Sequence, residues 1–273
     1  MDSHRQIVRH WNNVAEGWTT RRGYSNTVLA RHKRAVYLQL LDSWVGTKPV
    51  LALKTDLFAE ALNDEEFVSA LPWGESIIGI DISQAIVARA RERLTSGGAG
   101  PKGWVTCDVR SLPFASSTFD CVLSDSTLDH LATTAEIEAA LSEISRVLIP
   151  GGTMVLTIDN PHNLTYPPRW LMRLWLRLGL SPYFIGTTLT RQQLRAILPR
   201  IGFRFEEETT ILHYPHPDRL VRAAEAAVRA IGRGSLDNWI QRMFERLERL
   251  QHSKVRYFTG RYLAVRTTKV GAA

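Results

Sequence analysis

Short apolar runs alternate with amphipathic stretches through the middle of the chain. Five such runs begin between residues 50 and 153, and they read VLAL, SIIGID, WVTCD, FDCVLSD and TMVLTID. Their nearly unbroken apolar character is typical of parallel strands that are buried on both faces. The helical patterns between them cover residues 57–71, 84–94 and 134–147, and we expect the Pro-Gly-Gly of residues 150–152 to end the last helix. The alternation predicts an α/β fold with a doubly wound, Rossmann-like sheet.

Helical patterns also flank this core. Apolar residues recur at helical spacing in residues 7–18 and 28–44, before the core, and residues 218–251 read as amphipathic helices after it. Residues 202–212 and 257–268 read as two further strands, which bring the predicted sheet to seven strands. The expected organisation therefore has four parts, which are an N-terminal helical cap (1–46), a Rossmann-like core (47–160), a helical lid (161–200) and C-terminal strands and helices that complete the sheet (201–273).

Composition and charge narrow the class of protein. With 44% hydrophobic and 22% charged residues, the chain can bury an ordinary globular core. Cys107 and Cys121 lie in apolar runs, so we expect them to pack as small hydrophobic residues in a reducing cytoplasm. The N-terminus lacks the apolar region of a signal peptide, and no apolar run approaches membrane-spanning length, which also favours a cytoplasmic protein. We predict no metal site.

The net charge of +7 is unevenly distributed. Residues 48–160 carry eight Lys/Arg against 16 Asp/Glu, a balance of −8, which leaves +15 for the rest of the chain. A basic outer surface permits an anionic partner, such as a phosphorylated substrate, a membrane surface or nucleic acid. A solvated, arginine-rich helical surface without any such partner explains the same asymmetry.

The second apolar run ends in Asp81, directly before a predicted helix. A carboxylate at the end of a strand in this setting suits the two hydroxyls of a ribose. The preceding turn reads PVLALKTDLFAEAL and has no glycine, although turns that bind nucleotides usually contain several. The pattern thus indicates a nucleotide site with an atypical first turn.

Three segments together resemble a known family. They are GIDIS (79–83), CDVRSLPFASSTFDCVLSDSTLDHL (107–131) and ISRVLIPGGTMVLTI (144–158). In their order and spacing they are similar to the class I S-adenosylmethionine-dependent methyltransferases of the small-molecule type, over about residues 49–205. The resemblance implies S-adenosylmethionine as cofactor and methyl transfer to a small metabolite, with O-, N- and C-methylation all open; the apolar helix predicted over residues 169–180 indicates that this metabolite is lipophilic or aromatic.

The resemblance also assigns cofactor contacts to residues at the ends of the predicted strands. Asp81 would accept hydrogen bonds from the ribose hydroxyls, and Ile82 would flank the adenine. Further contacts would come from the ends of the third and fourth runs, namely from Asp108, Val109, Ser124, Asp125 and Ser126.

The first motif departs from the family pattern, because Lys54, Thr55 and Asp56 stand where acidic and glycine residues are usual. We predict that these three residues contact the cofactor, with Lys54 pairing with its methionine carboxylate and Asp56 with its ammonium. The alternative is that Thr55 or Asp56 caps a helix beginning at Leu57 while Lys54 points to solvent, and both roles could coexist.

Methyl transfer to an already activated carbon mainly requires positioning and the exclusion of water. A hydroxyl or phenol acceptor also requires a base. The candidates are Asp129 and His130 after the fourth strand, His162 after the fifth, and His213 or His216 near the sixth. Surface or structural roles for all four histidines remain the alternative.

Residues 159–163 read DNPHN, which is similar to the Asp/Asn-Pro-Pro-Tyr motif of methyltransferases that act on nucleic-acid bases. The segment follows the fifth strand instead of the fourth and lacks the aromatic residue that stacks on a flipped base, which argues against nucleic acid as a partner.

The predicted helix over residues 169–180 is rich in Trp and Leu, with Arg169, Arg173 and Arg177 spaced four apart. As an apolar lid it favours a lipophilic acceptor, and its arginines could hold an acceptor's carboxylate or phosphate or contact an anionic membrane surface. Alternatively, its apolar side packs on the sheet and the arginines face water.

Two other functions stay open at this level. One is a methyltransferase-like fold that binds the cofactor but catalyses another transfer or a rearrangement, which the glycine-free turn motivates. The other is a non-catalytic binding protein, in which Phe58 and Asp56 fill the space that glycine leaves open.

Overall fold

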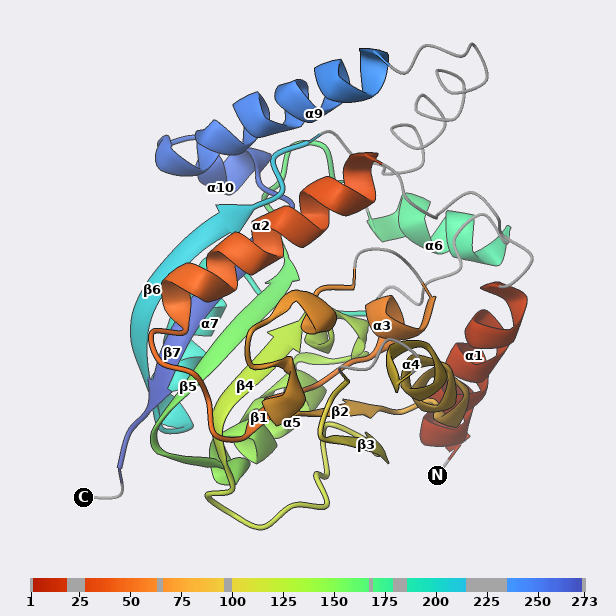
Figure 1. The fold of residues 1–273 in the computed structure, drawn as a ribbon, viewed down its shortest axis with the longest axis vertical. Coiled ribbons are helices and arrows are strands. Elements are labelled where there is room, and N and C mark those ends of the chain that lie inside the picture. The colour runs from red at the N-terminus through yellow and green to blue at the C-terminus, as the bar shows by residue number, and fades with distance from the viewer. Residues whose placement is uncertain are drawn as a thin grey trace.

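The computed structural model describes residues 2–18, 28–62, 66–95, 100–166, 169–178, 186–214 and 235–271. Within these ranges the strands form one seven-stranded sheet of order β3-β2-β1-β4-β5-β7-β6 (Figure 1). They are β1 (Ala52–Lys54), β2 (Ile77–Asp81), β3 (Gly103–Thr106), β4 (Phe119–Asp125), β5 (Leu148–Asp159), β6 (Phe203–Ile211) and β7 (Tyr262–Lys269). Strands β1 to β5 pair in parallel, and β7 runs antiparallel between β5 and β6. The predicted Rossmann-like α/β sheet of seven strands is confirmed.

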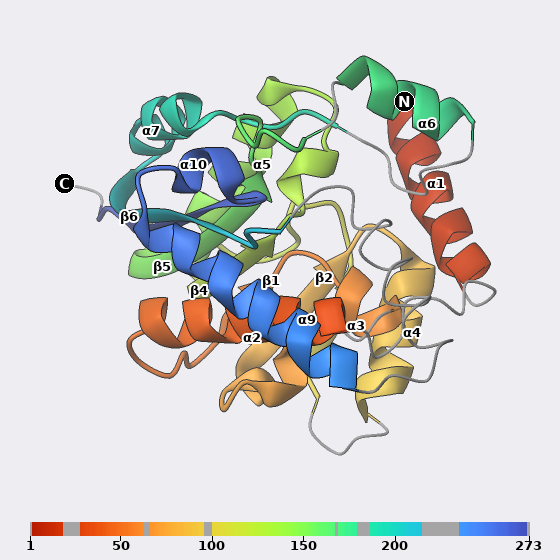
Figure 2. The ribbon, with the colours of Figure 1, turned by 90° about the horizontal axis from the view of Figure 1, so that it is seen from above.

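Helices cover both faces of the sheet (Figures 1 and 2). The α-helices in the described ranges are α1 (Asp2–Trp18), α2 (Val28–Trp44), α3 (Phe58–Leu62), α4 (Gln84–Thr95), α5 (Thr134–Val147), α6 (Arg169–Arg177), α7 (Arg191–Arg200), α9 (Ser235–Glu248) and α10 (Arg256–Thr259). Successive side chains of β4 alternate between the faces, as the twofold period of a strand requires. Val122 packs in the cluster with α5 and α7, whereas Cys121 and Leu123 pack in the cluster with α2 and α9. Both cysteines are free thiols, and Cys121 packs as a small hydrophobic residue, as predicted.

The N-terminal helices lie in two different places. Helix α2 packs on the sheet itself. Helix α9 packs against α2, where the rings of His32 (α2) and Phe244 (α9) are stacked with their centres 5.1 Å apart. Helix α1 packs instead against α3 and α4, in a smaller cluster that contains Trp11 and Leu57. The division of the chain into cap, core, lid and C-terminal part stays a prediction.

Helix α5 begins and ends at the predicted residues, but the Pro-Gly-Gly prediction is wrong. Thr133 caps the helix, and its hydroxyl accepts a hydrogen bond from the N–H of Glu136. The helix ends at Val147, and β5 starts at Leu148 and runs through the Pro-Gly-Gly segment. Gly151 has a φ of 80°, which side-chain-bearing residues rarely adopt, so the glycines form a bulge inside the strand instead of a stop after the helix.

The single helix expected over residues 57–71 is also wrong. Helix α3 ends at Leu62, and a separate 3₁₀ turn covers Val68–Ala70. The apolar residues of this segment serve two different clusters, because Leu57 packs with α1 and α4 while Phe67 and Val68 pack with α2. One straight helix cannot face both. Of the helices expected over residues 218–251, α9 begins at Ser235, and residues 215–234 lie outside the described ranges. The last strand begins at Tyr262 instead of residue 257, because Arg256–Thr259 form α10.

Candidate active site

The carboxyl ends of the parallel strands meet at one edge of the sheet. In this strand order, the crossovers change direction between β1 and β4, and that switch point is where open α/β sheets bind ligands. The turns after β1 and β4 are in direct contact there. The Thr55 hydroxyl lies 2.7 Å from that of Thr127 and donates to Ser124 Oγ at 3.2 Å. The structure therefore brings together residues that are 69 and 72 positions apart in sequence.

Asp81 ends β2 at this edge, and its carboxylate is held by the main chain. Its Oδ1 accepts the N–H of Ser83 at 2.8 Å and its Oδ2 accepts the N–H of Leu57 at 3.2 Å. The side chain is only 8% exposed. Burial, together with the nearby charge of Asp56, raises the pKa of Asp81 to about 7, although the two backbone hydrogen bonds oppose this rise. A fixed acceptor group thus stands where the sequence predicted a ribose contact, and Ile82, the next residue, packs beside α1 and α4.

The turn after β1 is organised by a buried ion pair. The Nζ atom of Lys54 lies 2.9 Å from Glu60 Oε2, and neither side chain is exposed. Lys54 also donates to the main-chain oxygen of Asp56 at 2.7 Å and lies 5.2 Å from the centre of the Phe67 ring. The alternative that Lys54 points to solvent is therefore wrong. The contact of Lys54 with the methionine carboxylate stays a prediction. Glu60 was not predicted from the sequence, where its only signal was its position six residues after Lys54.

Asp56 and Phe58 occupy the rest of this turn. Asp56 Oδ1 accepts the N–H of Phe58 at 2.6 Å, so Asp56 caps α3, as the structural alternative had it. Its partly exposed side chain still has acceptor capacity for a cofactor. The Phe58 ring packs edge-on against Trp11 of α1, with their centres 5.9 Å apart.

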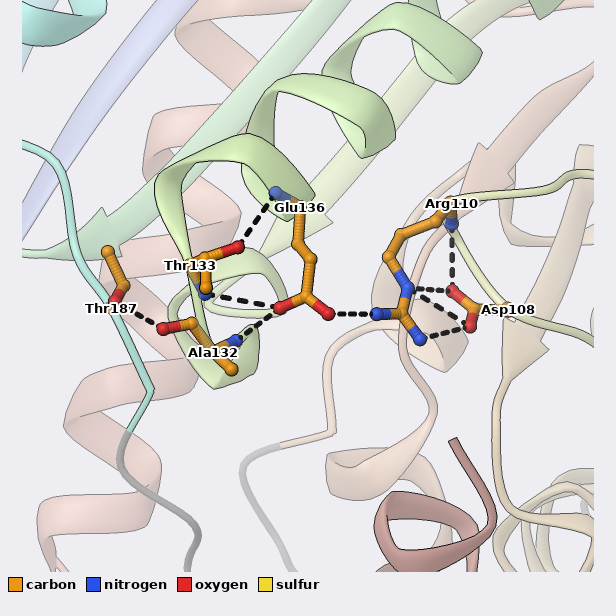
Figure 3. A network of polar contacts seen from close by, with 6 residues as sticks. All are labelled: Asp108, Arg110, Ala132, Thr133, Glu136 and Thr187. Atoms are coloured by element: carbon orange, nitrogen blue, oxygen red, sulfur yellow. Dashed lines mark hydrogen bonds and ion pairs between the residues drawn. The ribbon is translucent and has the colours of Figure 1, made fainter. Parts of the chain in front are cut away.

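Asp108, which follows β3, is held by Arg110 (Figure 3). Both carboxylate oxygens of Asp108 accept hydrogen bonds from the guanidinium, which also contacts Glu136 in the first turn of α5. Glu136 in turn completes the capping box with Thr133. The clamp fixes the segment after β3 against α5. The neighbouring Val109 side chain points into the core cluster instead of toward the edge.

The residues that end β4 form a buried polar group. Ser124 is 1% exposed. Asp125 accepts a hydrogen bond from Thr157 Oγ1 at 3.2 Å, and burial raises its pKa. Ser126 adopts a left-handed φ of 49°, which lets its hydroxyl donate to Asp129 Oδ2 at 2.8 Å. The three predicted residues therefore lie together at the edge, next to the candidate base Asp129.

Asp129 is a buried proton-acceptor candidate at this edge. Its Oδ2 also accepts the N–H of Asp159 at 3.1 Å, while its buried Oδ1 has no partner among the described residues. Burial, and then the charge of Asp159, raise the pKa of Asp129 to about 7. Tyr166, which sequence reasoning missed, donates to Asp159 Oδ2 at 2.7 Å and connects the segment after β5 to the same group.

The histidine candidates differ in their surroundings. The His130 ring packs against Trp11, with their centres 4.9 Å apart, close to the edge. His162 is exposed. His213 is buried, and both of its ring nitrogens are hydrogen-bonded, to Thr259 Oγ1 at 2.8 Å and to the Thr210 carbonyl oxygen at 3.1 Å, so the structural alternative describes it best. His216 lies outside the described residues.

Comparison with known proteins agrees with this fold. A family model described as "Methyltransferase domain" matches residues 62–156. The chain is 35% identical over 115 residues to EEF1A lysine methyltransferase 4 of Bos taurus, covering 37% of this chain and 43% of that protein. It is 36% identical over 181 residues to an uncharacterized 37.1 kDa protein in transposon TN4556 of Streptomyces fradiae, covering 64% of this chain and 48% of that protein. The chain thus spans less than half the length of these curated relatives.

Solved structures share the fold. The [4+2]-cyclase SpnF matches with a TM-score of 0.55 at 20% identity, over 88% of this chain and 81% of that chain. The geranyl diphosphate C-methyltransferase of Streptomyces coelicolor matches with a TM-score of 0.56 at 14% identity, over 86% of this chain and 77% of that chain.

The strand order is that of a Rossmann-like sheet, and residues 62–156 within it match a methyltransferase domain. The family model and the relatives support a class I S-adenosylmethionine-dependent methyltransferase with S-adenosylmethionine as cofactor, as the sequence predicted.

The residues at the edge fit this cofactor. Asp81 offers a rigid carboxylate to a diol, and Asp56 offers one to an ammonium. Two buried carboxylate oxygens, Glu60 Oε1 and Asp129 Oδ1, have no hydrogen-bond partner among the described residues. The edge therefore has hydrogen-bonding capacity that this part of the chain does not itself satisfy.

Proposed function

We propose that the protein transfers a methyl group from S-adenosylmethionine to a small, lipophilic or aromatic metabolite. The observation that carries the proposal is Asp81, a buried carboxylate fixed by two main-chain N–H groups at the end of β2, beside the switch point of the sheet. The apolar sequence of α6 (Arg169–Arg177) is the reason for expecting a lipophilic acceptor. In this assignment, Asp81 and Ile82 hold the adenosine, and Asp108 and the main chain of Val109 meet the adenine edge.

The residues at the ends of β1 and β4 hold the reacting end of the cofactor in this proposal. When bound, S-adenosylmethionine supplies a methyl group that is already activated by its sulfonium. The protein must then hold the acceptor atom about 3 Å from that carbon and exclude water. Trp11 packs against both Phe58 and His130, with ring centres 5.9 and 4.9 Å apart, and so bridges the two turns with aromatic rings.

Asp129 is the preferred base for an acceptor that must lose a proton. With a pKa of about 7, its carboxyl group can take up a proton near neutral pH, and a base poised there is the most effective. Ser126 and the N–H of Asp159 hold Oδ2, which leaves Oδ1 as the atom that receives the proton. His130 and His162 are the other candidates, and a purely positional mechanism needs none of the three.

One observation favours a second function. The turn after β1 carries a buried ion pair where the family usually has glycines, so the cofactor could be held differently and support another transfer or a rearrangement. The same fold occurs in a structure named as a [4+2]-cyclase. A relative of this chain is named for methylating a lysine, so amines belong among the acceptors tested.

Isothermal titration calorimetry with S-adenosylmethionine and S-adenosylhomocysteine tests cofactor binding. We expect the wild-type protein to bind both ligands and the Asp81→Ala variant to bind them at least about tenfold more weakly, because a charged hydrogen-bond acceptor is lost. Asp42→Ala, which changes an exposed carboxylate on α2, is the matched control and should bind like the wild type. A folded wild-type protein that binds neither ligand would contradict the proposal.

Product analysis separates the two functions. Incubation with S-adenosylmethionine and panels of phenols, amines and prenyl compounds should yield S-adenosylhomocysteine in equal amount to a methylated product. A converted acceptor with S-adenosylmethionine left intact would favour the rearrangement instead.

A further inference from the structure

Helix α6 presents an apolar row to solvent. Trp170, Leu174 and Leu178 are spaced four residues apart and are 68%, 43% and 62% exposed. Leu178 continues the helix, because its N–H donates to the Leu174 carbonyl oxygen at 3.0 Å. Met172 is buried, and at about 100° per residue it lies on the opposite side of the helix from this row. The alternative in which the apolar side of this helix packs on the sheet is therefore wrong for the row Trp170, Leu174 and Leu178.

The row has positive charge beside it. Arg169, Arg173 and Arg177 repeat at the same spacing, which places their backbone positions in an adjacent row, and Arg177 is exposed. Helix α6 belongs to the basic part of the chain, because the segments outside residues 48–160 carry a net charge of +15. An exposed apolar row with arginines along one side is the pattern of a helix that lies in a membrane interface.

A second exposed apolar group lies close to the segment that precedes α6. Leu164 is 80% exposed, and its N–H donates to the main-chain oxygen of Phe258 at 2.9 Å. Phe258 and Val255 are 50% and 48% exposed, with the exposed Lys254 beside them. Figure 1 shows α6 and α10 on the same half of the molecule, toward which β4 and β5 point.

We propose that α6, supported by the Leu164 and Phe258 group, docks the protein on an anionic lipid membrane. The apolar side chains would enter the boundary between headgroups and acyl chains, and the arginines would bind lipid phosphates. None of the helices in the described part of the chain combines the length and the apolar character of a membrane-spanning segment. With nine residues, α6 is roughly 13 Å long, so it lies along the interface. The proposal goes beyond methyl transfer and does not depend on it.

Vesicle flotation tests the proposal with the full chain. The probes are vesicles of phosphatidylcholine alone and of phosphatidylcholine mixed with phosphatidylglycerol. We expect the wild-type protein to float with the mixed vesicles, less with the neutral ones, and less again at high salt. Trp170→Ser combined with Leu174→Ser should weaken binding at least about tenfold, because apolar area no longer enters the interface.

The control is Trp239→Ser, which removes an exposed tryptophan from α9, where it is 56% exposed, and should bind like the wild type. All changed side chains are exposed, so the melting temperatures of both variants should stay close to that of the wild type. A folded wild-type protein that ignores the mixed vesicles would overturn the proposal, and so would equal binding by the double variant. A wild-type dimer that the double variant converts to a monomer, without vesicle binding by either, would assign this face to a second copy and also overturn it.

Discussion

Lys54 and Glu60 form an ion pair, with Nζ and Oε2 2.9 Å apart, that is completely buried in the turn after β1. Burial alone would lower the pKa of Lys54, but the charges of Glu60 and Asp56 more than offset it and hold that pKa above its ordinary value. The pair connects the end of the strand to α3, six residues further on, in the place where glycines normally shape the turn. It fixes the position of Leu57, whose N–H holds the Asp81 carboxylate.

Breaking this pair on one side should be costly. We expect Lys54→Met to lower the free energy of unfolding by about 3–5 kcal/mol, because it leaves the Glu60 carboxylate buried without a counter-charge. The double variant Lys54→Met with Glu60→Leu should recover much of that loss, since no charge remains buried. Urea unfolding of both variants measures the difference. A double variant that is no more stable than the single one would show that the charge itself is not the source of the cost.

Cofactor affinity should depend on the ionisation of Asp81. Its pKa of about 7 means that the carboxylate becomes fully ionised, and thus the best acceptor for ribose hydroxyls, only above neutral pH. We expect the affinity for S-adenosylhomocysteine to rise between pH 6 and pH 8 in the wild type. In Asp81→Asn it should be lower and nearly independent of pH, as calorimetry at several pH values would measure. An equally steep rise in the variant would assign the dependence to another group.

The raised pKa of Asp129 should also make stability depend on pH. Its pKa is about 7 in the folded protein and about 3.9 in an unfolded chain, so the folded state holds more protons between these values. By linkage, its contribution to stability falls as the pH rises through this range and levels off above it. The lowered pKa of His213, caused by burial, acts in the opposite direction below about pH 6.5, the ordinary pKa of histidine, so only a comparison isolates Asp129.

Asp129→Asn provides that comparison. Its amide oxygen can accept the bonds from Ser126 and the Asp159 N–H, and its NH₂ group replaces the unpartnered oxygen. Relative to the wild type, the variant should become more stable as the pH increases from 5 to 8, as thermal unfolding would measure. A constant difference across this range would contradict the raised pKa.

The clamp formed by Arg110 should contribute more than an ordinary surface ion pair. The Arg110 side chain is only 18% exposed and contacts both Asp108 and Glu136, so we expect Arg110→Gln to cost about 1–2 kcal/mol of unfolding free energy. Arg200→Gln is the matched control, because Arg200 also pairs with a glutamate of α5 but is 64% exposed, and it should cost less than about 0.5 kcal/mol. Equal losses of unfolding free energy for the two variants, measured by urea unfolding, would show that the clamp contributes no more than a surface ion pair.

Local sequence patterns predicted the elements whose partners lie close in the chain. Helix α5 begins and ends at its predicted residues, 134 and 147, because its capping box and its apolar repeat are both local signals. The prediction of a single helix over residues 57–71 was wrong because the apolar residues of this segment divide between two clusters that form only in the folded protein. Pro150 and the glycines after it could equally have ended a helix or made a bulge, and the pairing of β5 with β4 selected the bulge.

The candidate site shows the same division. The carboxylates Asp81, Asp108 and Asp125 were evident from the sequence, because each ends an apolar run that reads as a strand. The sequence did not indicate Glu60, Arg110 or Tyr166. Each of them bonds to another side chain, and the sequence does not specify which side chains will meet in the folded protein.

The sequence by itself determined the order of the strands along the chain and which carboxylates stand at or just after their ends, since these follow from periodicity and from spacing, and three of its segments carried the resemblance to a methyltransferase family. Only the tertiary structure decided which charges became buried pairs and which side of α6 faces water. It also decided that Asp129 Oδ1 has no partner among the described residues. The physical reason is that burial and charge pairing depend on groups that approach one another through space, and the free energy of a charge is set by those neighbours.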